Sequence, residues 1–173
     1  MKVAIRPETE KDYEEITRIH NLAFSRINEG KLVENLRKTP SFVSELSLVA
    51  EYENRIIGHV LFYPIKINSG TTKCDSLSLA PISVHPNYQN RGIESKLIEK
   101  GLETAKRLGF KSVIVLGHPE YYPRFGFEVA SNWGICAPFD APDDVFFAME
   151  LTKEGLKNCR GKVEFPQEFD NCI

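Results

Sequence analysis

The chain has 173 residues, of which 42% are hydrophobic and 27% charged, with a formal net charge of −2 and a pI near 6.1. These values are typical of one globular domain with a sizeable core. A slightly acidic chain lacks the basic surface that nucleic-acid binding requires, so we expect no nucleic-acid partner. No apolar stretch approaches the roughly 20 residues that span a bilayer, and the N-terminus turns polar too early for a secretory signal. We therefore expect a cytoplasmic protein without membrane association.

Four cysteines are scattered along the chain, at Cys74, Cys136, Cys159 and Cys172. None of them forms a C-x-x-C pair, so the spacing indicates neither a zinc site nor a redox motif, and we expect no metal. In a reducing cytosol we predict free thiols, with a disulfide framework as the alternative.

The first forty residues predict a strand followed by two helices. Residues 2–6 have the pattern of a short strand, and Thr9 is a plausible N-cap. Apolar residues then recur at helical spacing from Tyr13 to Phe24. A second helix is predicted from Asn28 to Lys38, because Pro40 cannot continue it.

Strands dominate the middle of the chain. Ser47–Tyr52 and Ile56–Ile67 flank a short polar turn and predict a hairpin. A second turn at 68–70 leads to a third strand, Ser76–Val84, of the same antiparallel set.

A crossover connection follows this set. An amphipathic stripe predicts a long helix from Ile93 to Leu108, and the continuous apolar run at 113–116 predicts a strand buried on both faces. A strand, a helix and a second strand in this order form a right-handed crossover, which makes residues 76–84 and 113–116 parallel neighbours.

The remaining residues complete the predicted architecture. A loop at 132–144 leads to a strand at 145–151, and the tail at 152–173 contains GKVEF as a possible edge strand. We expect a single domain over 1–173, with its core in 1–151. The fold class is α/β (α+β): a mixed, mostly antiparallel sheet with one parallel pair, flanked by helices.

The stretch SVHPNYQNRGIES, residues 83–95, carries the strongest functional signal. A helix N-terminus presents unpaired N–H groups and the positive end of the helix dipole, so residues 90–95 are suited to bind phosphate. Gly92 permits close approach of the backbone. The alternative is a plain loop whose glycine only begins the helix. A nucleotide triphosphatase is excluded by the lack of a G-x-x-x-x-G-K-[ST] motif.

Two motifs resemble the GCN5-related N-acetyltransferase (GNAT) superfamily. Q-x-x-G at Gln89–Gly92 resembles the family's [QR]-x-x-G-x-[GA] pattern, and YPRFGF at Tyr122–Phe127 resembles its Y-x-x-x-G-F pattern. The run LGHPEYYPRFGF is similar to the YhbS-like branch of predicted acetyltransferases. The resemblance covers nearly the whole chain, and its fold has the same element order, with the parallel pair splayed apart.

This resemblance implies acetyl-CoA as the co-substrate. The strand end at 82–84 would hold the pantetheine arm through its backbone, and the segment 90–95 would hold the pyrophosphate. The expected cofactor-binding residues are Ile82, Ser83, Val84, Gln89, Asn90, Arg91, Gly92, Ile93, Glu94 and Ser95. Tyr122 would protonate the departing thiolate as the catalytic residue. Tyr121 is the alternative acid, and packing is the alternative role for both tyrosines.

Glu94 departs from the family pattern, which has a small residue at this position. A carboxylate beside a pyrophosphate costs on the order of 1 kcal/mol at about 4 Å in water, so Glu94 places the cofactor affinity in doubt. We expect its side chain to point outward, where it would interact favourably with the helix dipole. Substitution Glu94→Gly is expected to tighten coenzyme A binding.

The sequence identifies no general base. Gly117 and His118 stand where many relatives have an asparagine, so that cofactor contact does not carry over. His118 is the histidine next to the predicted acid, although packing at a strand end is its alternative role. His20 and His85 are expected to be structural. The other candidate bases are Glu51, His59, Asp75 and Glu120.

The predicted function is direct transfer of an acetyl group from acetyl-CoA to a primary amine of a small molecule or protein. The acceptor would enter between the segment 24–30 and the loop 132–144, where Asp140, Asp143 and Asp144 would attract a cation. A homodimer is compatible with this function. The alternative is a coenzyme A-binding sensor or interaction domain that has lost turnover, supported by Glu94 and the missing base.

Overall fold

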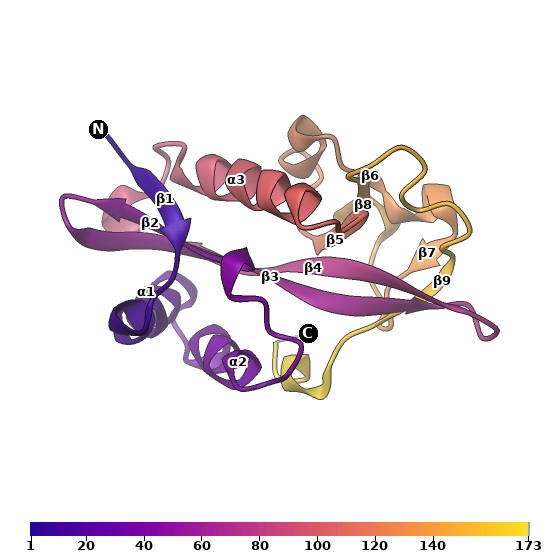
Figure 1. The fold of residues 1–173 in the computed structure, drawn as a ribbon, viewed down its shortest axis with the longest axis horizontal. Coiled ribbons are helices and arrows are strands. Elements are labelled where there is room, and N and C mark those ends of the chain that lie inside the picture. The colour runs from indigo at the N-terminus through magenta and orange to yellow at the C-terminus, as the bar shows by residue number, and fades with distance from the viewer. Residues whose placement is uncertain (173) are drawn as a thin grey trace.

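The computed structural model describes residues 1–172, whose strands form one sheet flanked by three α-helices (Figure 1). The helices are α1 (Tyr13–Phe24), α2 (Asn28–Arg37) and α3 (Ile93–Arg107). The strands are β1 (Ala4–Pro7), β2 (Ser47–Tyr52), β3 (Arg55–Asn68), β4 (Lys73–Val84), β5 (Ser112–Leu116), β6 (Glu128–Val129), β7 (Ile135–Cys136), β8 (Phe146–Glu150) and β9 (Gly161–Glu164). The main path through the sheet is β1-β2-β3-β4-β5-β8-β6, with β9 paired to β3 and β7.

Helices cover the sheet on both faces. Figure 1 shows α1 and α2 below β2 and β3, and α3 above them. The lower face packs Ile16, Leu32 and Leu36 against the sheet, and the upper face packs Leu97 and Ile98. These are the apolar positions at helical spacing, which explains why all three helices were predicted within one residue of their observed bounds.

The predicted parallel pair is present and short. β4 and β5 pair in parallel only at Leu77 with Val113 and at Ser78 with Ile114. Beyond these residues β4 continues to Val84 without β5 beside it, so one backbone edge of β4 has no neighbouring strand. The fold class is confirmed. An additional two-residue parallel pair, β7 with β9, was not predicted, because both strands are too short to show a pattern.

A β-bulge lies in β4 where the two strands separate. Phe62 pairs with Leu79 and Val60 pairs with Ile82, so three steps along β4 match two steps along β3. A bulge bends its strand and re-aims the backbone groups that follow it. The extra residue in β4 therefore sets the direction in which the backbone groups at the end of this strand point.

Several predicted elements required correction. β4 begins at Lys73 rather than Ser76, because a polar, exposed hairpin end gives no hydrophobic signal. Between β5 and β6 a 3-10 turn occupies Tyr122–Phe125. β9 lies at the predicted GKVEF but pairs with two strands rather than forming a free edge. No helix within residues 1–172 combines the length and apolar character needed to cross a bilayer.

The prediction of four free thiols was wrong. Cys74 at the start of β4 is bonded to Cys159 in the tail, with 5.6 Å between their Cα atoms, while Cys136 and Cys172 are free. The partners are 85 residues apart, so only the meeting of the β3–β4 hairpin with the tail brings them together. Sequence spacing alone contains no trace of this pairing.

Candidate active site

The turn between β4 and α3 is shaped by two residues with left-handed backbone. Asn90 has φ 61° and Gly92 has φ 78°, and Gly92 is the N-cap of α3. A Cβ built on Gly92 would meet nothing within 4 Å, so the backbone there faces open space. The Gln89 side chain donates a hydrogen bond to the Val84 carbonyl at 3.1 Å, which ties the turn to the strand end. Gln89 thus has a structural role here beside the cofactor contact predicted for it.

The first turn of α3 has unpaired backbone donors. The N–H groups of Ile93, Glu94 and Ser95 lack intrahelical acceptors, and no described side chain caps them. With the helix dipole they form a site suited to an anion. Asn90 and Arg91 are exposed beside them, and the Arg91 guanidinium lies 5.5 Å from the centre of the Tyr88 ring.

Tyr121 belongs to this helix end. Its hydroxyl lies 3.0 Å from Ser95 Oγ, and the Arg124 guanidinium lies over its ring at 4.5 Å. Burial raises the pKa of Tyr121, and its hydrogen bond with Ser95 opposes that rise. The hydroxyl of Tyr121 is therefore occupied by α3, which leaves Tyr122 as the phenol that lies between the splayed strands.

Tyr122 is buried, with 6% of its surface exposed, and packs among the aromatic rings of Phe127 and Phe147. The backbone at Gly117 lies against its ring, so closely that a Cβ at this position would overlap it. The His118 carbonyl accepts a hydrogen bond from the Tyr122 N–H at 3.4 Å. Gly117 and His118, which replace the family's asparagine, thus position the tyrosine.

The state of the Tyr122 hydroxyl suits an acid. Burial raises the pKa of Tyr122, and the nearby charge of Glu94 and the neighbouring Tyr121 act in the same direction. The phenol therefore holds its proton throughout the physiological pH range.

A cavity of about 370 Å³ lies where β4 and β5 separate, and we call it the central cavity. Its walls come from β4, β5, the end of α1, the start of α2, and the tail. Among its lining residues are Ser78, Leu79, Ala80, Pro81, Ile82, Ile114, Val115, Leu116, Tyr122, Phe24, Arg26, Glu29, Phe139, Phe165, Phe169 and Cys172. The tail residues in this wall were not predicted, because an isolated phenylalanine in a polar tail gives no periodic signal.

Glu94 does not point outward as predicted. Its side chain is half-buried, and burial raises the pKa of Glu94, against the opposing charge of Arg124. Its charge acts on both Tyr121 and Tyr122, so the carboxylate lies on their side of α3. The side chain is therefore only partly exposed to solvent.

The predicted acceptor side borders the central cavity. Phe24, Arg26 and Glu29 line it, and the Arg26 guanidinium pairs with the buried Glu29 carboxylate. From the loop 132–144 only Phe139 is part of this lining. Its aspartates, at 140, 143 and 144, are exposed and lie outside the lining, so the carboxylate in the lining is Glu29, which is already paired with Arg26.

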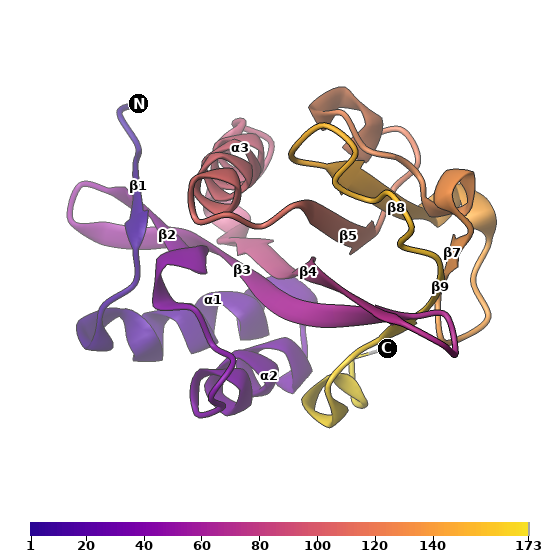
Figure 2. The ribbon, with the colours of Figure 1, turned by 45° about the vertical axis from the view of Figure 1, so that its right-hand side comes forward.

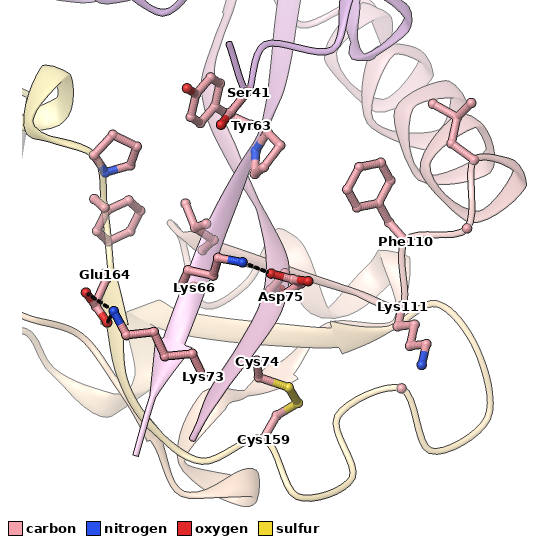
Figure 3. Close-up of a pocket in the computed structure, with 18 of the residues that line it drawn as sticks. Ser41, Tyr63, Lys66, Lys73, Cys74, Asp75, Phe110, Lys111, Cys159 and Glu164 are labelled. Carbon is pink, nitrogen blue, oxygen red and sulfur yellow. Dashed lines mark hydrogen bonds and ion pairs between the residues drawn. A yellow bond between two sulfur atoms is a disulfide. The ribbon is translucent and has the colours of Figure 1, made fainter. Parts of the chain in front are cut away.

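A larger hollow of about 1030 Å³ lies away from α3's first turn, beside the disulfide (Figure 3). Figure 3 shows two ion pairs in it, Lys66 with Asp75 and Lys73 with Glu164 at 3.2 Å, while the Lys111 side chain has no partner among the residues drawn. Because neither candidate tyrosine lines this hollow and Tyr122 lines the central cavity, we place the candidate active site in the central cavity.

The predicted bases are dispersed. Glu51 is paired with Arg6 at 2.7 Å, and Asp75 is occupied by Lys66. Glu120 and His118 are exposed. The fifth candidate, His59, is fully buried. Within residues 1–172 no cluster of three His, Cys, Asp or Glu side chains is arranged to hold a metal ion.

Comparison with known proteins shows the family. A family model described as an acetyltransferase (GNAT) domain matches residues 4–130. The uncharacterized N-acetyltransferase YjhQ of Escherichia coli K12 is 37% identical over 134 residues, which cover 77% of this chain and 74% of that protein. The uncharacterized N-acetyltransferase YhbS of the same strain is 30% identical over 167 residues, covering 96% and 98% respectively.

Solved structures agree with this result. The crystal structure of YhbS from E. coli in complex with CoA has a TM-score of 0.90 and 29% identity, over 98% of this chain and 93% of that one. A GNAT family acetyltransferase from Brucella melitensis in complex with acetyl-CoA has a TM-score of 0.80 and 30% identity, over 98% and 99%. The predicted enzyme class, an acyl-CoA-dependent acetyltransferase, is confirmed by these matches. The chain belongs to the GNAT acetyltransferase family.

Proposed function

We propose that the protein transfers the acetyl group of acetyl-CoA directly to a primary amine. The observation that carries this proposal is the placement of Tyr122 in a cavity between the splayed strands, while the adjacent Tyr121 is hydrogen-bonded to Ser95 in the first turn of α3. In this proposal the N–H groups at the start of α3 bind the phosphates, and the cavity beside Tyr122 receives the thioester. Residues 1–173 act as one domain in this proposal, because β9 of the tail pairs with the central strand β3.

The chain fits acetyl-CoA as a substrate. The pyrophosphate would be bound by the backbone N–H groups from Gly92 to Ser95, where the glycine leaves open space. The pantetheine arm would add like a strand to the free edge of β4 at Ile82–Val84. Two relatives were crystallised with CoA or acetyl-CoA, which supports this assignment.

The reaction needs three groups from the protein. The acceptor must lose a proton, because an ammonium has no electron pair with which to attack. The oxyanion of the tetrahedral intermediate needs a preorganised donor, which we assign to a backbone N–H near the bulge in β4. When the carbon–sulfur bond breaks, the thiolate takes a proton from the Tyr122 hydroxyl.

The experiment is an assay of free thiol released from acetyl-CoA in the presence of single amines. Alkylamines, amino sugars, lysine peptides and peptides with free N-termini cover the acceptor classes that the cavity admits. We expect release that requires both protein and one class of amine, with the acetylated amine detected by mass spectrometry. Binding of acetyl-CoA without release, for every amine, would refute the enzyme proposal.

The half-buried Glu94 favours a second candidate function, a coenzyme A-binding sensor. A carboxylate in the first turn of α3 opposes the negative phosphates that this turn would bind, and the predicted general bases are dispersed, two of them in ion pairs. A sensor would bind acetyl-CoA equally well in the wild type and in Tyr122→Phe and would consume none. An enzyme would lose turnover in that variant while keeping the affinity.

A further inference from the structure

The central cavity has an aromatic wall, formed by the tail and the loop 132–144. The ring centroids of Phe139 and Phe165 lie 6.4 Å apart in a stacked arrangement, and those of Phe165 and Phe169 lie 5.3 Å apart. All three rings line the cavity, together with the Tyr122 ring. Phe169 is buried and packs in the same cluster as Leu32 of α2, which fixes the wall to the rest of the fold. This wall offers a bound molecule apolar surface rather than hydrogen bonds.

Apolar side chains that are exposed to solvent also line this cavity. Five large hydrophobic residues are exposed among residues 1–172, and two of them belong to the lining: Phe24 at the end of α1, with 40% of its surface exposed, and Leu116 at the end of β5, with 47%. Exposed hydrophobic residues that gather at a cavity are typical of a ligand-binding surface. The solvent-exposed part of the lining therefore has the same apolar character as the aromatic wall.

Charge in the cavity lining is confined to one ion pair. Among the lining residues that the structure describes, only Arg26 and Glu29 are charged, and Arg26 donates two hydrogen bonds to the Glu29 carboxylate, with Nε 2.8 Å from Oε1. Burial raises the pKa of the Cys172 thiol, so this lining residue is neutral at pH 7. A second positive charge on a bound amine would therefore find no unpaired carboxylate in the lining, and an isolated charge in such surroundings is costly.

The size of the cavity favours a small molecule as the acceptor. Its volume of about 370 Å³ is near the lower end of the range for ligand sites, which is roughly 300–1,000 Å³. The thioester end of acetyl-CoA must share this space beside Tyr122 if the acetyl group is transferred there. The remaining space suits one short alkyl or aryl group rather than a segment of folded protein.

We propose that the acceptor is a small monoamine whose amino group is carried on an alkyl or aryl group. This inference rests on the amine acetylation proposed above and names the substrate class of the same site. The apolar group packs against Phe139, Phe165 and Phe24, where its removal from water supplies the binding free energy. The amino group points toward the thioester beside Tyr122 and is the one charge that the acceptor brings into the cavity.

Two amines of equal length test the proposal. Hexylamine and cadaverine differ only in that a terminal methyl group of the first is a second ammonium group in the second. We expect kcat/KM to be about 100-fold higher for hexylamine. From ethylamine to hexylamine, kcat/KM should rise about fourfold with each added methylene until the cavity is full. An equal or higher value for cadaverine would overturn the inference, and so would a higher value for Nα-acetyl-lysine amide, which has an alkyl stem on a polar backbone.

Phe139 is the wall residue to substitute, because it is half-buried in the loop 132–144 and lies outside the helices and strands. We expect Phe139→Ala to lower the ratio of kcat/KM for hexylamine to that for ethylamine about tenfold, since the shorter amine buries less apolar surface. Phe139→Leu should restore most of this ratio, because leucine returns apolar volume to the wall. Pro138→Ala is the matched control, since this exposed neighbour is absent from the lining, and it should retain the wild-type ratio. An unchanged ratio in Phe139→Ala would overturn the inference.

Calorimetric titration of the complex between the protein and coenzyme A separates this inference from the proposed function. Coenzyme A has no acetyl group to transfer, so hexylamine can bind this complex without reacting. We expect hexylamine to bind more tightly than cadaverine, and equal affinities would overturn the inference. If hexylamine binds in this way but is never acetylated from acetyl-CoA, the proposed function fails and the assigned ligand class stands. If amines are acetylated but cadaverine or the lysine derivative is preferred, this inference fails and the acetyltransferase proposal stands.

Discussion

Figure 2 shows α3 on one face of the sheet and α1 and α2 on the other. On the α3 face the backbone N–H groups of Ile93–Ser95 have no side-chain cap, whereas on the α1/α2 face buried polar side chains are hydrogen-bonded to one another. Backbone donors at a helix end need no partner while water reaches them. Buried ionisable groups such as Glu8 must be paired, because an isolated charge in the interior is prohibitively costly. The donors at the start of α3 are therefore available to a ligand, whereas the polar groups on the other face are already paired with one another.

The largest expected effect concerns Tyr122, which lies between these two regions. Tyr122→Phe removes the proton donor and should lower kcat by about 100-fold or more, with the affinity for coenzyme A unchanged. Steady-state kinetics and calorimetric titration measure the two quantities. Tyr121→Phe is the matched comparison, and a larger loss of kcat in that variant would transfer the acid role to Tyr121.

The second prediction breaks the buried network on the α1/α2 face, where Glu8 accepts two hydrogen bonds from Arg37, at 2.9 and 3.0 Å, and lies 3.6 Å from His59. Glu8→Gln leaves Arg37 and His59 without their carboxylate and should lower the free energy of unfolding at pH 7 by about 3 kcal/mol. Because folding lowers the pKa of Glu8 from 4.5 to about 2, its contribution is complete above pH 4.5 and is lost as the pH falls toward 2.

Urea unfolding of both proteins at pH 7 and at pH 3 measures this difference. Glu51→Gln is the control, since Glu51 forms a half-exposed pair with Arg6 and should cost less than about 1 kcal/mol. A Glu8→Gln effect independent of pH would show that packing, rather than charge, makes the contribution.

The third prediction concerns how tightly α3 packs on the sheet. A Cβ on Gly101 would overlap the ring of Phe62. Overpacking costs about 3 kcal/mol, and alanine returns about 1 kcal/mol of helix propensity, so Gly101→Ala should destabilise the fold by about 2 kcal/mol. Lys100→Ala, at the exposed neighbouring position, should change the unfolding free energy by less than about 0.5 kcal/mol. Equal urea midpoints for the two variants would contradict this packing.

The smallest expected effect concerns coenzyme A affinity and Glu94, in the first turn of α3. Glu94→Gln removes a charge beside the phosphate site without altering the side-chain shape, and coenzyme A should bind about fivefold more tightly, which corresponds to about 1 kcal/mol. Glu99→Gln, an exposed position further along α3, controls for the change in overall charge. Unchanged or weaker binding by Glu94→Gln in calorimetric titration would show that the carboxylate does not oppose the phosphates.

Local signals predicted much of the fold because each depends on neighbours in sequence. The helical spacing of apolar residues in α1 and α3 buries one face of each helix whatever lies opposite it. The turn at residues 90–95 was also predictable, since a glycine followed by the start of a helix fixes the local backbone geometry. The start of β4 escaped prediction because its exposed residues have no apolar pattern.

Side-chain directions were harder to predict. The direction of Glu94 depends on Arg124 and the two tyrosines, which lie about thirty residues away in sequence. His20 was expected to be structural, and it is fully buried with its Nε2 2.8 Å from His59 Nδ1. Its partner could not be predicted, because His59 and the nearby Glu8 come from two other segments of the chain.

The sequence by itself indicated the family, the order of helices and strands, the glycine turn that begins α3, and the two adjacent tyrosines proposed as candidate acids. Each of these properties depends on neighbouring residues, whose backbone preferences and apolar spacing can be seen in the sequence. Only the tertiary structure decided which tyrosine borders the cavity, which cysteines are bonded, and that Glu8, His59 and His20 lie together. Each of those depends on contacts between segments that are distant in sequence, where the packing of the whole sheet sets the distances.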